Sequence, residues 1–267
     1  MNYSGKTALI TGASSGIGYE FAKALHRRGC TIIGVARRGE KLEELKTLLE
    51  RDRPSSFEVI VADLSSSALE RVVAYIETHS IDILINNAGR GSFGQFEEIS
   101  LPEEVEMVSL NVIAPMKLTH AVLPQMKSRK QGAIVAISSI AAFQPLPYMA
   151  TYAATKAFNF SHAMGLRYEL APFNIKVLSV NPGPVETEFA GVARIPGTVS
   201  GGPRDSATSV VEESLQALER GAGYVVPCLR AKLMWLTIGI LPRSVSTFFT
   251  GRALKSTLEA AKRNLRK

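Results

Sequence analysis

The hydrophobic positions of the chain form two kinds of segment that alternate along its length. Apolar runs of four to six residues are separated by longer stretches in which apolar residues recur every three or four positions. The runs cover residues 6–10, 31–36, 57–62, 81–85, 133–138, 175–180 and 223–226. Continuous apolar runs are typical of parallel strands that helices cover on both faces. The pattern therefore predicts a single-domain α/β fold, a doubly wound parallel sheet of about seven strands with helices on both faces.

One of the expected helices, residues 101–129, contains two residues that disfavour a regular helix. Because Asn111 and Pro115 lie in its interior, we expect a kink near Asn111 and a free backbone carbonyl that can hold a water. Residues 189–203, by contrast, are rich in Gly, Pro and Ser and show no periodicity. They fit either a mobile lid over a substrate pocket or a plain surface loop.

The turn after the first apolar run is rich in glycine and leads directly into a helical pattern. It reads Thr11-Gly12-Ala13-Ser14-Ser15-Gly16-Ile17-Gly18. Gly12 permits a tight turn, Gly16 lets a pyrophosphate approach the backbone, and Gly18 lets the helix pack closely on the strand. The free N–H groups at the helix N-terminus then face the phosphates. The sequence therefore predicts a Rossmann-like dinucleotide site.

The end of the second apolar run indicates which dinucleotide is bound. An acidic residue for the adenosine ribose is expected about 20 residues after the glycines, but this place holds Arg37 and Arg38. A carboxylate would repel a 2′-phosphate, whereas arginines bind one through charge-assisted hydrogen bonds. The sequence therefore favours NADP(H) over NAD(H). Two solvated arginines that open a helix are the plainer alternative.

Three further loops follow apolar runs and are expected beside the cofactor. Asp63, which precedes Leu64, can accept a hydrogen bond from the adenine amino group or cap the next helix, and both roles stay open. Asn86-Asn87-Ala88-Gly89 permits a close approach of the backbone, and its asparagines can join neighbouring strands. Residues 181–187 form a rigid turn that can lie beside the nicotinamide, with Thr187 near its carboxamide.

Tyr152 and Lys156 are the candidate acid/base pair. Four residues apart on a helix, they share one face. A phenol is a poor proton donor or acceptor at neutral pH unless a cation favours the phenolate, and a lysine one turn away is such a cation. The spacing alone is weak evidence, because a lysine stem lying along an exposed aromatic ring gives the same pattern.

Composition narrows the class of protein. With 267 residues, of which 46% are hydrophobic, the chain can bury the core of one large domain. Cys30 and Cys228 have no partner pattern and the four histidines form no ligand-like pair, so we expect neither a disulfide framework nor a metal site. The first strand pattern is reached by Thr7, which leaves no room for a signal peptide, and we expect a cytoplasmic protein.

The positive charge of the chain is concentrated in its C-terminal segment. Residues 228–267 carry nine basic side chains and one acidic one, whereas the net charge of the whole chain is +7. Residues 233–242 are mostly apolar and include the single tryptophan, but a bilayer span takes about 20 residues. This run can lie in a membrane interface with the tryptophan at headgroup level, cover the substrate pocket or pack across a subunit boundary. No aromatic residues are interleaved on a basic face, so nucleic-acid binding is not expected.

Taken together, the motifs resemble the short-chain dehydrogenase/reductase family over roughly residues 5–227. The resemblance depends on the glycine turn, Asn86-Asn87-Ala88-Gly89, Asn111, Ser139, Tyr152 with Lys156, and Pro182-Gly183, all in the order of the family. The 13-residue step from Ser139 to Tyr152 is also typical of the family. The resemblance implies a catalytic domain, residues 1–227. Many family members end soon after the last strand, whereas this chain continues, and we expect residues 228–267 to form a basic, partly apolar helical extension packed on that domain.

The resemblance implies a role for each catalytic residue. Tyr152 is the general acid/base, and Lys156 lowers the pKa of the phenol and holds the nicotinamide ribose. Ser139 donates a hydrogen bond to the substrate oxygen, and Asn111 supports a water that relays protons to Lys156. The implied cofactor-binding residues are Gly12, Ser14, Ser15, Gly16, Ile17, Gly18, Arg37, Arg38, Asp63, Leu64, Asn87, Ala88, Gly89, Tyr152, Lys156, Pro182, Gly183, Val185 and Thr187.

The implied reaction is hydride transfer between a nicotinamide and a substrate carbon, which interconverts a ketone or aldehyde and an alcohol. The apolar C-terminal run suggests a hydrophobic small-molecule substrate. Family members are usually homodimers or homotetramers joined through the helices that here contain Asn111 and Tyr152, and the extension can block one of these interfaces. A nonenzymatic NADP(H)-binding sensor or scaffold is the alternative, although no member of the catalytic set is missing.

Overall fold

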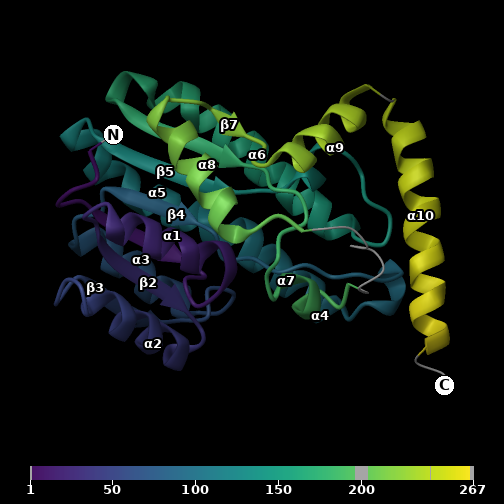
Figure 1. The fold of residues 1–267 in the computed structure, drawn as a ribbon, viewed down its shortest axis with the longest axis horizontal. Coiled ribbons are helices and arrows are strands. Elements are labelled where there is room, and N and C mark those ends of the chain that lie inside the picture. The colour runs from purple at the N-terminus through teal and green to yellow at the C-terminus, as the bar shows by residue number, and fades with distance from the viewer. Residues whose placement is uncertain (1, 196–203, 241, 265–267) are drawn as a thin grey trace.

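Seven parallel strands form one sheet at the centre of the protein (Figure 1). The structure, a computed structural model, describes residues 2–195, 204–240 and 242–264. The strands are β1 (Thr7–Thr11), β2 (Thr31–Ala36), β3 (Phe57–Val61), β4 (Ile83–Asn86), β5 (Gly132–Ile137), β6 (Ile175–Val180) and β7 (Tyr224–Val225). Their order is β3-β2-β1-β4-β5-β6-β7, and every neighbouring pair is parallel. The predicted doubly wound, Rossmann-like sheet of about seven strands is confirmed.

Helices cover both faces of this sheet, and each face has its own core. One layer contains α1 (Gly16–Arg27), α2 (Gly39–Glu50) and α8 (Ala207–Glu219), and the other contains α3 (Ala68–Thr78), α5 (Ala114–Arg129) and α6 (Ala150–Leu170). The side chains of Phe21 and Leu42 are fully buried in the first core, and those of Val72 and Val122 in the second. Burial on both faces explains why the strands appear in the sequence as continuous apolar runs.

The strand order fixes where a ligand can bind. β1 pairs with β2 on one side and with β4 on the other, so that Ile10 lies between Gly34 and Ile85. The chain thus winds outward in one direction as far as β3 and in the opposite direction from β4 onward. In sheets of this kind the crevice outside the carboxyl ends of the strands at this switch point is the ligand site.

The expected helix of residues 101–129 is interrupted at Asn111. α4 (Leu101–Val108) and α5 are joined by a π-helical turn, Ser109–Ile113. Pro115 follows this turn and has no N–H to donate to the helical carbonyls that precede it. The predicted irregularity near Asn111 is therefore confirmed and takes the form of a π-helical turn.

Short helices fill several of the connections. They are η1 (Phe96–Glu98), η3 (Ile140–Phe143), η4 (Ala171–Phe173) and α7 (Phe189–Val192). α7 opens the segment 189–203, for which a lid and a surface loop were both expected. Residues 196–203 of that segment lie outside the described residues.

Two helices, α9 (Leu229–Ile240) and α10 (Arg243–Asn264), follow the last strand. α9 packs on the body through Ala231, which is fully buried, and through Trp235. The Trp235 ring lies 6.1 Å from that of Phe143 and 6.2 Å from that of Tyr224, between ring centroids. The tryptophan is therefore partly buried in an aromatic cluster. This differs from the expectation that it lies in a membrane interface at headgroup level.

α10 stands beside the rest of the molecule in Figure 1. Its contacts with the body lie near the loop at residues 144–147, where the Ser246 hydroxyl donates a hydrogen bond to Gln144 Oε1. Within the described residues, no helix is both long and apolar enough to cross a membrane.

Candidate active site

The glycine turn brings α1 and β1 against the loop that follows β4. Gly12 and Gly16 have φ angles of 68° and 57°, which residues with a side chain rarely adopt. A Cβ atom on Gly12 would lie 2.8 Å from Asn87 Nδ2, and one on Gly18 would lie 2.4 Å from the same atom. The N-terminus of α1 has neither a side-chain cap nor an acidic residue in its first turn. Its positive end is therefore available to an anion.

Arg38, the second of the two arginines after β2, contacts this turn. Arg38 Nη2 donates hydrogen bonds to Ser15 Oγ at 2.9 Å and to Ser14 Oγ at 3.3 Å. The same nitrogen lies 2.8 Å from Glu188 Oε2, which belongs to the turn after β6. The Arg38 side chain is 44% exposed, so its positive charge sits at the open edge of the crevice, beside two hydroxyls.

Arg37 points toward two carboxylates on other elements. Its Nη1 lies 3.8 Å from Asp63 Oδ2, after β3, and 3.7 Å from Glu106 Oε1 on α4. Asp63 also accepts hydrogen bonds from the N–H of Ser65 at 2.9 Å and from the Ser65 hydroxyl at 2.6 Å. It therefore stabilises the turn before α3 and does not cap the helix itself, which begins after Ser67. Burial raises the pKa of Asp63, but the hydrogen bonds from Ser65 and the charge of Arg37 bring it below its usual value.

Asn87 and Thr11 join the loop after β4 to the glycine turn. Thr11 Oγ1 accepts hydrogen bonds from the N–H groups of Asn87 at 2.9 Å and Ala88 at 3.0 Å. Asn87 Nδ2 donates to the carbonyl oxygen of Thr11 at 2.8 Å. The predicted role of this asparagine in joining neighbouring strands is confirmed, since β1 and β4 are adjacent.

This loop continues to the catalytic candidates. A Cβ atom on Gly89 would lie 3.2 Å from Asn111 Oδ1 and 3.5 Å from Lys156 Nζ. Only a residue without a side chain fits easily between these groups. The glycine thus lets the loop run directly past both polar side chains.

α6 holds Tyr152 and Lys156 on one buried face, as their spacing predicts. They are 8% and 5% exposed, and Lys156 Nζ lies 5.7 Å from the centroid of the tyrosine ring. The ammonium group donates a hydrogen bond to the carbonyl oxygen of Ile137, the last residue of β5, at 2.9 Å. Ser139, two residues further on, is hydrogen-bonded to Tyr152 and accepts a hydrogen bond from the N–H of Ala141. The three side chains therefore meet at the carboxyl end of β5.

Burial shifts the two pKa values in opposite directions. It raises the pKa of Tyr152 to about 12, against the opposing effect of the hydrogen bond with Ser139. It lowers the pKa of Lys156 to about 8. The net shift of the phenol is upward because loss of hydration penalises the phenolate more than the hydrogen bond with Ser139 stabilises it. The expected lowering of this pKa by Lys156 stays a prediction. Tyr152 is consequently a protonated phenol at neutral pH.

Asn111 links the loop after β4 to α6 from its position in the π-helical turn. Its Oδ1 accepts a hydrogen bond from the N–H of Arg90 at 3.0 Å, and its Nδ2 donates to the carbonyl oxygen of Arg90 at 2.9 Å. Nδ2 also donates to Thr155 Oγ1, next to Lys156 in the chain, at 3.0 Å. The side chain is 1% exposed. Support of a proton-relay water by Asn111 stays a prediction.

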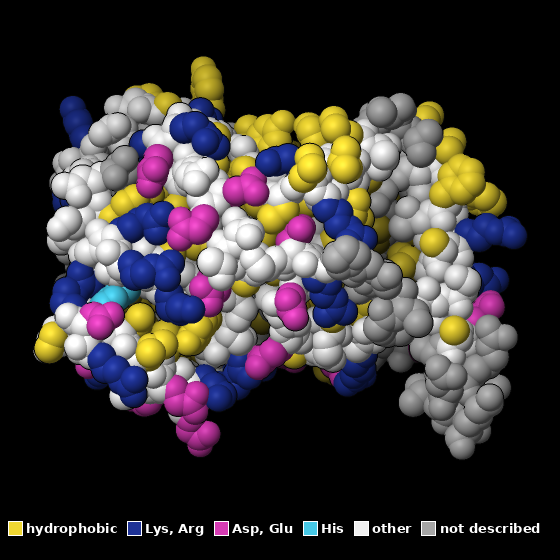
Figure 2. Space-filling model, in the orientation of Figure 1, with side chains coloured by type: hydrophobic (Ala, Val, Ile, Leu, Met, Phe, Trp, Pro, Cys, Tyr) yellow, Lys and Arg dark blue, Asp and Glu magenta, His cyan; other side chains and the backbone are white. Residues whose placement is uncertain are grey.

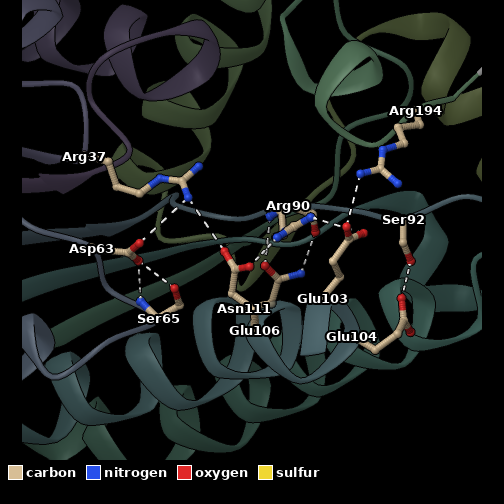
Figure 3. A network of polar contacts seen from close by, with 10 residues as sticks. All are labelled: Arg37, Asp63, Ser65, Arg90, Ser92, Glu103, Glu104, Glu106, Asn111 and Arg194. Carbon is tan, nitrogen blue, oxygen red and sulfur yellow. Dashed lines mark hydrogen bonds and ion pairs between the residues drawn. The ribbon is translucent and has the colours of Figure 1, made fainter. Parts of the chain in front are cut away.

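An acidic cluster on α4 surrounds Arg90 (Figure 3). Arg90 Nη1 lies 2.6 Å from Glu106 Oε2, and its Nη2 lies 3.9 Å from Glu103 Oε2. Glu106 also faces Arg37, and Glu103 is 3.1 Å from Arg194, after α7. The same view shows Ser92 hydrogen-bonded to the buried Glu104 at 2.6 Å. This network joins the cofactor edge, the loop at Asn111 and the segment after α7.

Apolar side chains pack around Tyr152. The ring of Phe189, the first residue of α7, lies 5.4 Å from the Tyr152 ring between centroids. The cluster around the tyrosine also contains Met107, Ala141, Met149, Phe93, Leu146 and Ile195. The acid/base candidate therefore lies in a mostly apolar setting.

The turn after β6 closes the crevice. Thr187 packs on the glycine turn, because a Cβ atom on Gly16 would lie 2.9 Å from Thr187 Cγ2. The carbonyl oxygen of Pro182 accepts a hydrogen bond from the N–H of Ile140, and a Cβ atom on Gly183 would lie 3.1 Å from Ala231 Cβ on α9. Val185 and Ile17 pack against the core on the α1 side of the sheet. Leu64 lines a small cavity with Thr11, below the loop after β4.

The donor set fits a dinucleotide phosphate. Glycines that tolerate no Cβ atom, an uncapped helix N-terminus and an arginine held by two serine hydroxyls lie together at the switch point of the sheet. Such groups recognise phosphate through N–H donors and positive charge. Among the described residues, no group of three or more His, Cys, Asp or Glu side chains could hold a metal ion.

Several residues of the site were not identified from the sequence. Their contacts join segments that are separated in the chain. These residues are Arg90, Glu103, Glu106 and Phe189. The only signal was the concentration of acidic residues in Leu101–Val108, which also fits a solvated helix start.

Comparisons with known proteins agree with this geometry. Residues 6–195 match the family model of the short chain dehydrogenases. A dehydrogenase/reductase SDR family protein 7-like protein of Anopheles gambiae is 33% identical over 227 residues, which cover 78% of this chain and 71% of that protein.

Solved structures give the same result. A short-chain dehydrogenase from Sphingobium yanoikuyae, in complex with NADPH, has a TM-score of 0.81 at 34% identity, over 88% of this chain and 92% of that one. The bulky-bulky ketone specific alcohol dehydrogenase from Comamonas testosteroni has a TM-score of 0.77 at 33% identity, over 88% and 90% of the two chains.

Proposed function

Because the chain belongs to the short-chain dehydrogenase family, we propose that it is an NADP(H)-dependent oxidoreductase that interconverts a hydrophobic ketone or aldehyde and the corresponding alcohol. The observation that carries the proposal is the meeting of Tyr152, Lys156 and Ser139 at the carboxyl end of β5. These three side chains lie beside the loop after β4, which also contacts the glycine turn through Asn87. An acid/base group and a phosphate-binding turn therefore open into one crevice.

The choice of NADP(H) is supported by the charge at the edge of that crevice. Arg38 is hydrogen-bonded to two hydroxyls of the glycine turn, and Arg37 lies at the end of the same strand. An arginine beside hydroxyl groups is a suitable site for the additional phosphate of NADP(H). The related protein from Sphingobium yanoikuyae was solved with NADPH.

Tyr152 acts as the proton donor in reduction. A bound nicotinamide cofactor supplies the hydride in this chemistry. The protonated phenol gives its proton to the carbonyl oxygen of the substrate, and the reverse transfer occurs in alcohol oxidation. The Ser139 hydroxyl donates a hydrogen bond to the same oxygen as negative charge develops there. The Lys156 ammonium, 5.7 Å from the ring centroid, stabilises the phenolate that remains.

A hydrophobic substrate is supported by the surroundings of Tyr152. Phe189, Met107 and Met149 belong to the cluster that packs around the phenol ring. Burial of apolar substrate atoms against such side chains provides binding without demanding polar partners. The related Comamonas testosteroni enzyme is described as specific for bulky ketones.

We also propose that the protein is a cytoplasmic homodimer or homotetramer. An exposed apolar stripe follows α4, the π-helical turn and the start of α5: Leu101, Val105, Val108, Ile113 and Met116. Spacings of four and three residues keep the first three on one face, and five residues across the π-helical turn preserve that alignment. A continuous apolar stripe of this kind suits self-association.

The experiment that tests the function is a panel of carbonyl substrates with NADPH and with NADH. We expect oxidation of NADPH with bulky apolar ketones or aldehydes, followed through the absorbance of the reduced nicotinamide. Activity confined to small polar sugars would contradict the assigned substrate class. Tight NADPH binding without turnover of any carbonyl would instead support a nonenzymatic sensor or scaffold.

A further inference from the structure

α10 contacts the body through its small and polar residues. Ser246 is 5% exposed and hydrogen-bonds to Gln144, and a Cβ atom on Gly251 would lie 3.1 Å from Pro147 Cγ. Phe248 and Phe249 are 63% and 60% exposed. A helix that serves only to cover a body turns its apolar face inward. In α10 the two phenylalanines instead face away from the protein.

Further exposed apolar residues lie on α9 and at the start of α10. Leu233 and Leu236 are 55% and 51% exposed, and Val245 is 37% exposed. Figure 2 shows hydrophobic side chains and basic side chains together on this part of the surface. Among the side chains of this segment whose exposure the structure describes, the exposed basic ones are Arg230, Lys232, Arg243, Arg252 and Lys255. Large apolar groups interspersed with positive charges are typical of helices that lie in a membrane interface.

We propose that residues 229–264, the C-terminal arm, bind the surface of a membrane that contains anionic lipids. Phe248 and Phe249 insert between headgroups, and the basic side chains contact lipid phosphates. The segment 228–267 has nine basic residues and one acidic residue, so its charge complements such a surface. Basic groups near an anionic membrane strengthen such binding through attraction to the negative surface potential.

A second copy of the chain fits this face less well. In a twofold contact the same patch meets itself, and two strongly basic segments would then lie against each other. Like charges brought together in this way oppose association. The glutamates of α4 lie between residues of the apolar stripe, but Glu104 is buried and Glu103 and Glu106 are paired with Arg90. The two exposed apolar regions therefore suit different partners.

The position of the arm relates it to the candidate active site. Gln144 and Pro147, which α10 contacts, belong to the segment that continues to Met149 and Tyr152. Leu146 of the same segment packs in the apolar cluster around Tyr152. A lipid surface at α10 would thus lie close to the wall of the pocket. The proposal does not depend on the oxidoreductase activity, because lipid binding is measured without turnover.

Co-sedimentation with vesicles tests the proposal on the full chain. Vesicles of equal parts phosphatidylcholine and phosphatidylglycerol are compared with vesicles of phosphatidylcholine alone. We expect the protein to bind the anionic vesicles at least about tenfold more tightly, and raised salt to weaken this binding. The variant F248S/F249S should bind them at least about tenfold more weakly, because it removes the inserted apolar area.

Matched variants separate the arm from general surface effects. L48S/F96S removes exposed apolar side chains, 40% and 61% exposed, elsewhere on the protein, and should bind as the wild type does. R252E/K255E should abolish the preference for anionic vesicles, whereas R51E/R220E, with the same change in charge, should retain most of it. Unchanged NADPH binding shows that each variant is folded.

Three results would overturn the proposal. The first is the absence of binding to anionic vesicles, and the second is an equal loss in the arm variants and their matched controls. The third is a lower molecular mass of F248S/F249S in lipid-free buffer, which would assign this face to a second copy of the chain.

Discussion

Tyr152 and Lys156 face each other in an environment that opposes charge on both. Burial raises the pKa of the phenol to about 12 and lowers the pKa of the ammonium group to about 8. At neutral pH the pair therefore consists of a neutral donor and a cation held at a cost in stability. This arrangement keeps the proton on Tyr152 until a substrate oxygen accepts it.

A pH dependence of stability follows for Lys156. The lysine of the unfolded chain titrates near 10.5, so between pH 8 and pH 10 the unfolded state binds more protons at this site than the folded state. The free energy of unfolding of the wild type should therefore rise relative to that of Lys156→Met, by about 1 to 2 kcal/mol over this range. Urea denaturation at several pH values measures the difference. A difference that stays constant from pH 7 to pH 10 would show that the ammonium group is not desolvated.

Arg37 and Arg38 should determine the choice of cofactor. R37A/R38A removes charge-assisted hydrogen bonds to a 2′-phosphate, so the Kd for NADPH should rise about 10- to 100-fold. The Kd for NADH should change by less than about threefold, since NADH lacks that phosphate. Fluorescence titration of both cofactors measures the two constants, with R220A as the control. Equal losses for NADPH and NADH would show that the arginines only support the fold.

At the scale of elements, local chemistry made most of the fold predictable. The apolar runs, the glycine turn and the irregularity at Asn111 all depend on residues close together in the chain, and β1, α1 and the π-helical turn lie where these patterns indicate. The ion pairs of Arg90 with Glu103 and Glu106, called the α4 network below, depend on packing between separate segments of the chain. The contact of Phe189 with Tyr152 does so too. No local pattern in the sequence could specify them. The pKa of Tyr152 likewise depends on burial, which residue spacing does not report.

The α4 network gives a prediction for Arg90. Its guanidinium pairs with Glu103 and Glu106, and both of its backbone polar groups bind the Asn111 side chain. Arg90→Ala should loosen the loop beside Lys156, so kcat should fall about tenfold while the Kd for NADPH changes by less than about threefold. Steady-state kinetics and cofactor titration separate these effects.

Two further variants test whether Arg90 acts by holding the loop beside Lys156 in place. Lys117→Ala breaks an exposed ion pair with Glu70, outside the network, and should leave kcat unchanged. Arg90→Lys retains the charge and should recover part of the lost kcat. A fall in NADPH affinity equal to the fall in kcat would contradict a positioning role.

At the scale of the molecule, two exposed apolar regions lie on different elements. The stripe on α4 and α5 is proposed for self-association, and the C-terminal arm is proposed for a lipid surface. Val105, 56% exposed, lies within the stripe. Val105→Glu should raise the dissociation constant of the oligomer at least about tenfold, because a buried unpaired carboxylate is costly. Sedimentation velocity measures this change, with Leu48→Glu as the control. An unchanged oligomer would place the subunit interface elsewhere.

The central claim is that Tyr152 supplies the proton in an NADPH-dependent carbonyl reduction. Its most direct test is turnover of a bulky apolar ketone by the wild type and by Tyr152→Phe, together with the Kd of each protein for NADPH. Loss of the hydroxyl should reduce kcat by at least about 100-fold, in the range of general acid catalysis, with NADPH affinity unchanged. A Tyr152→Phe variant that binds NADPH and retains the wild-type rate would contradict the claim.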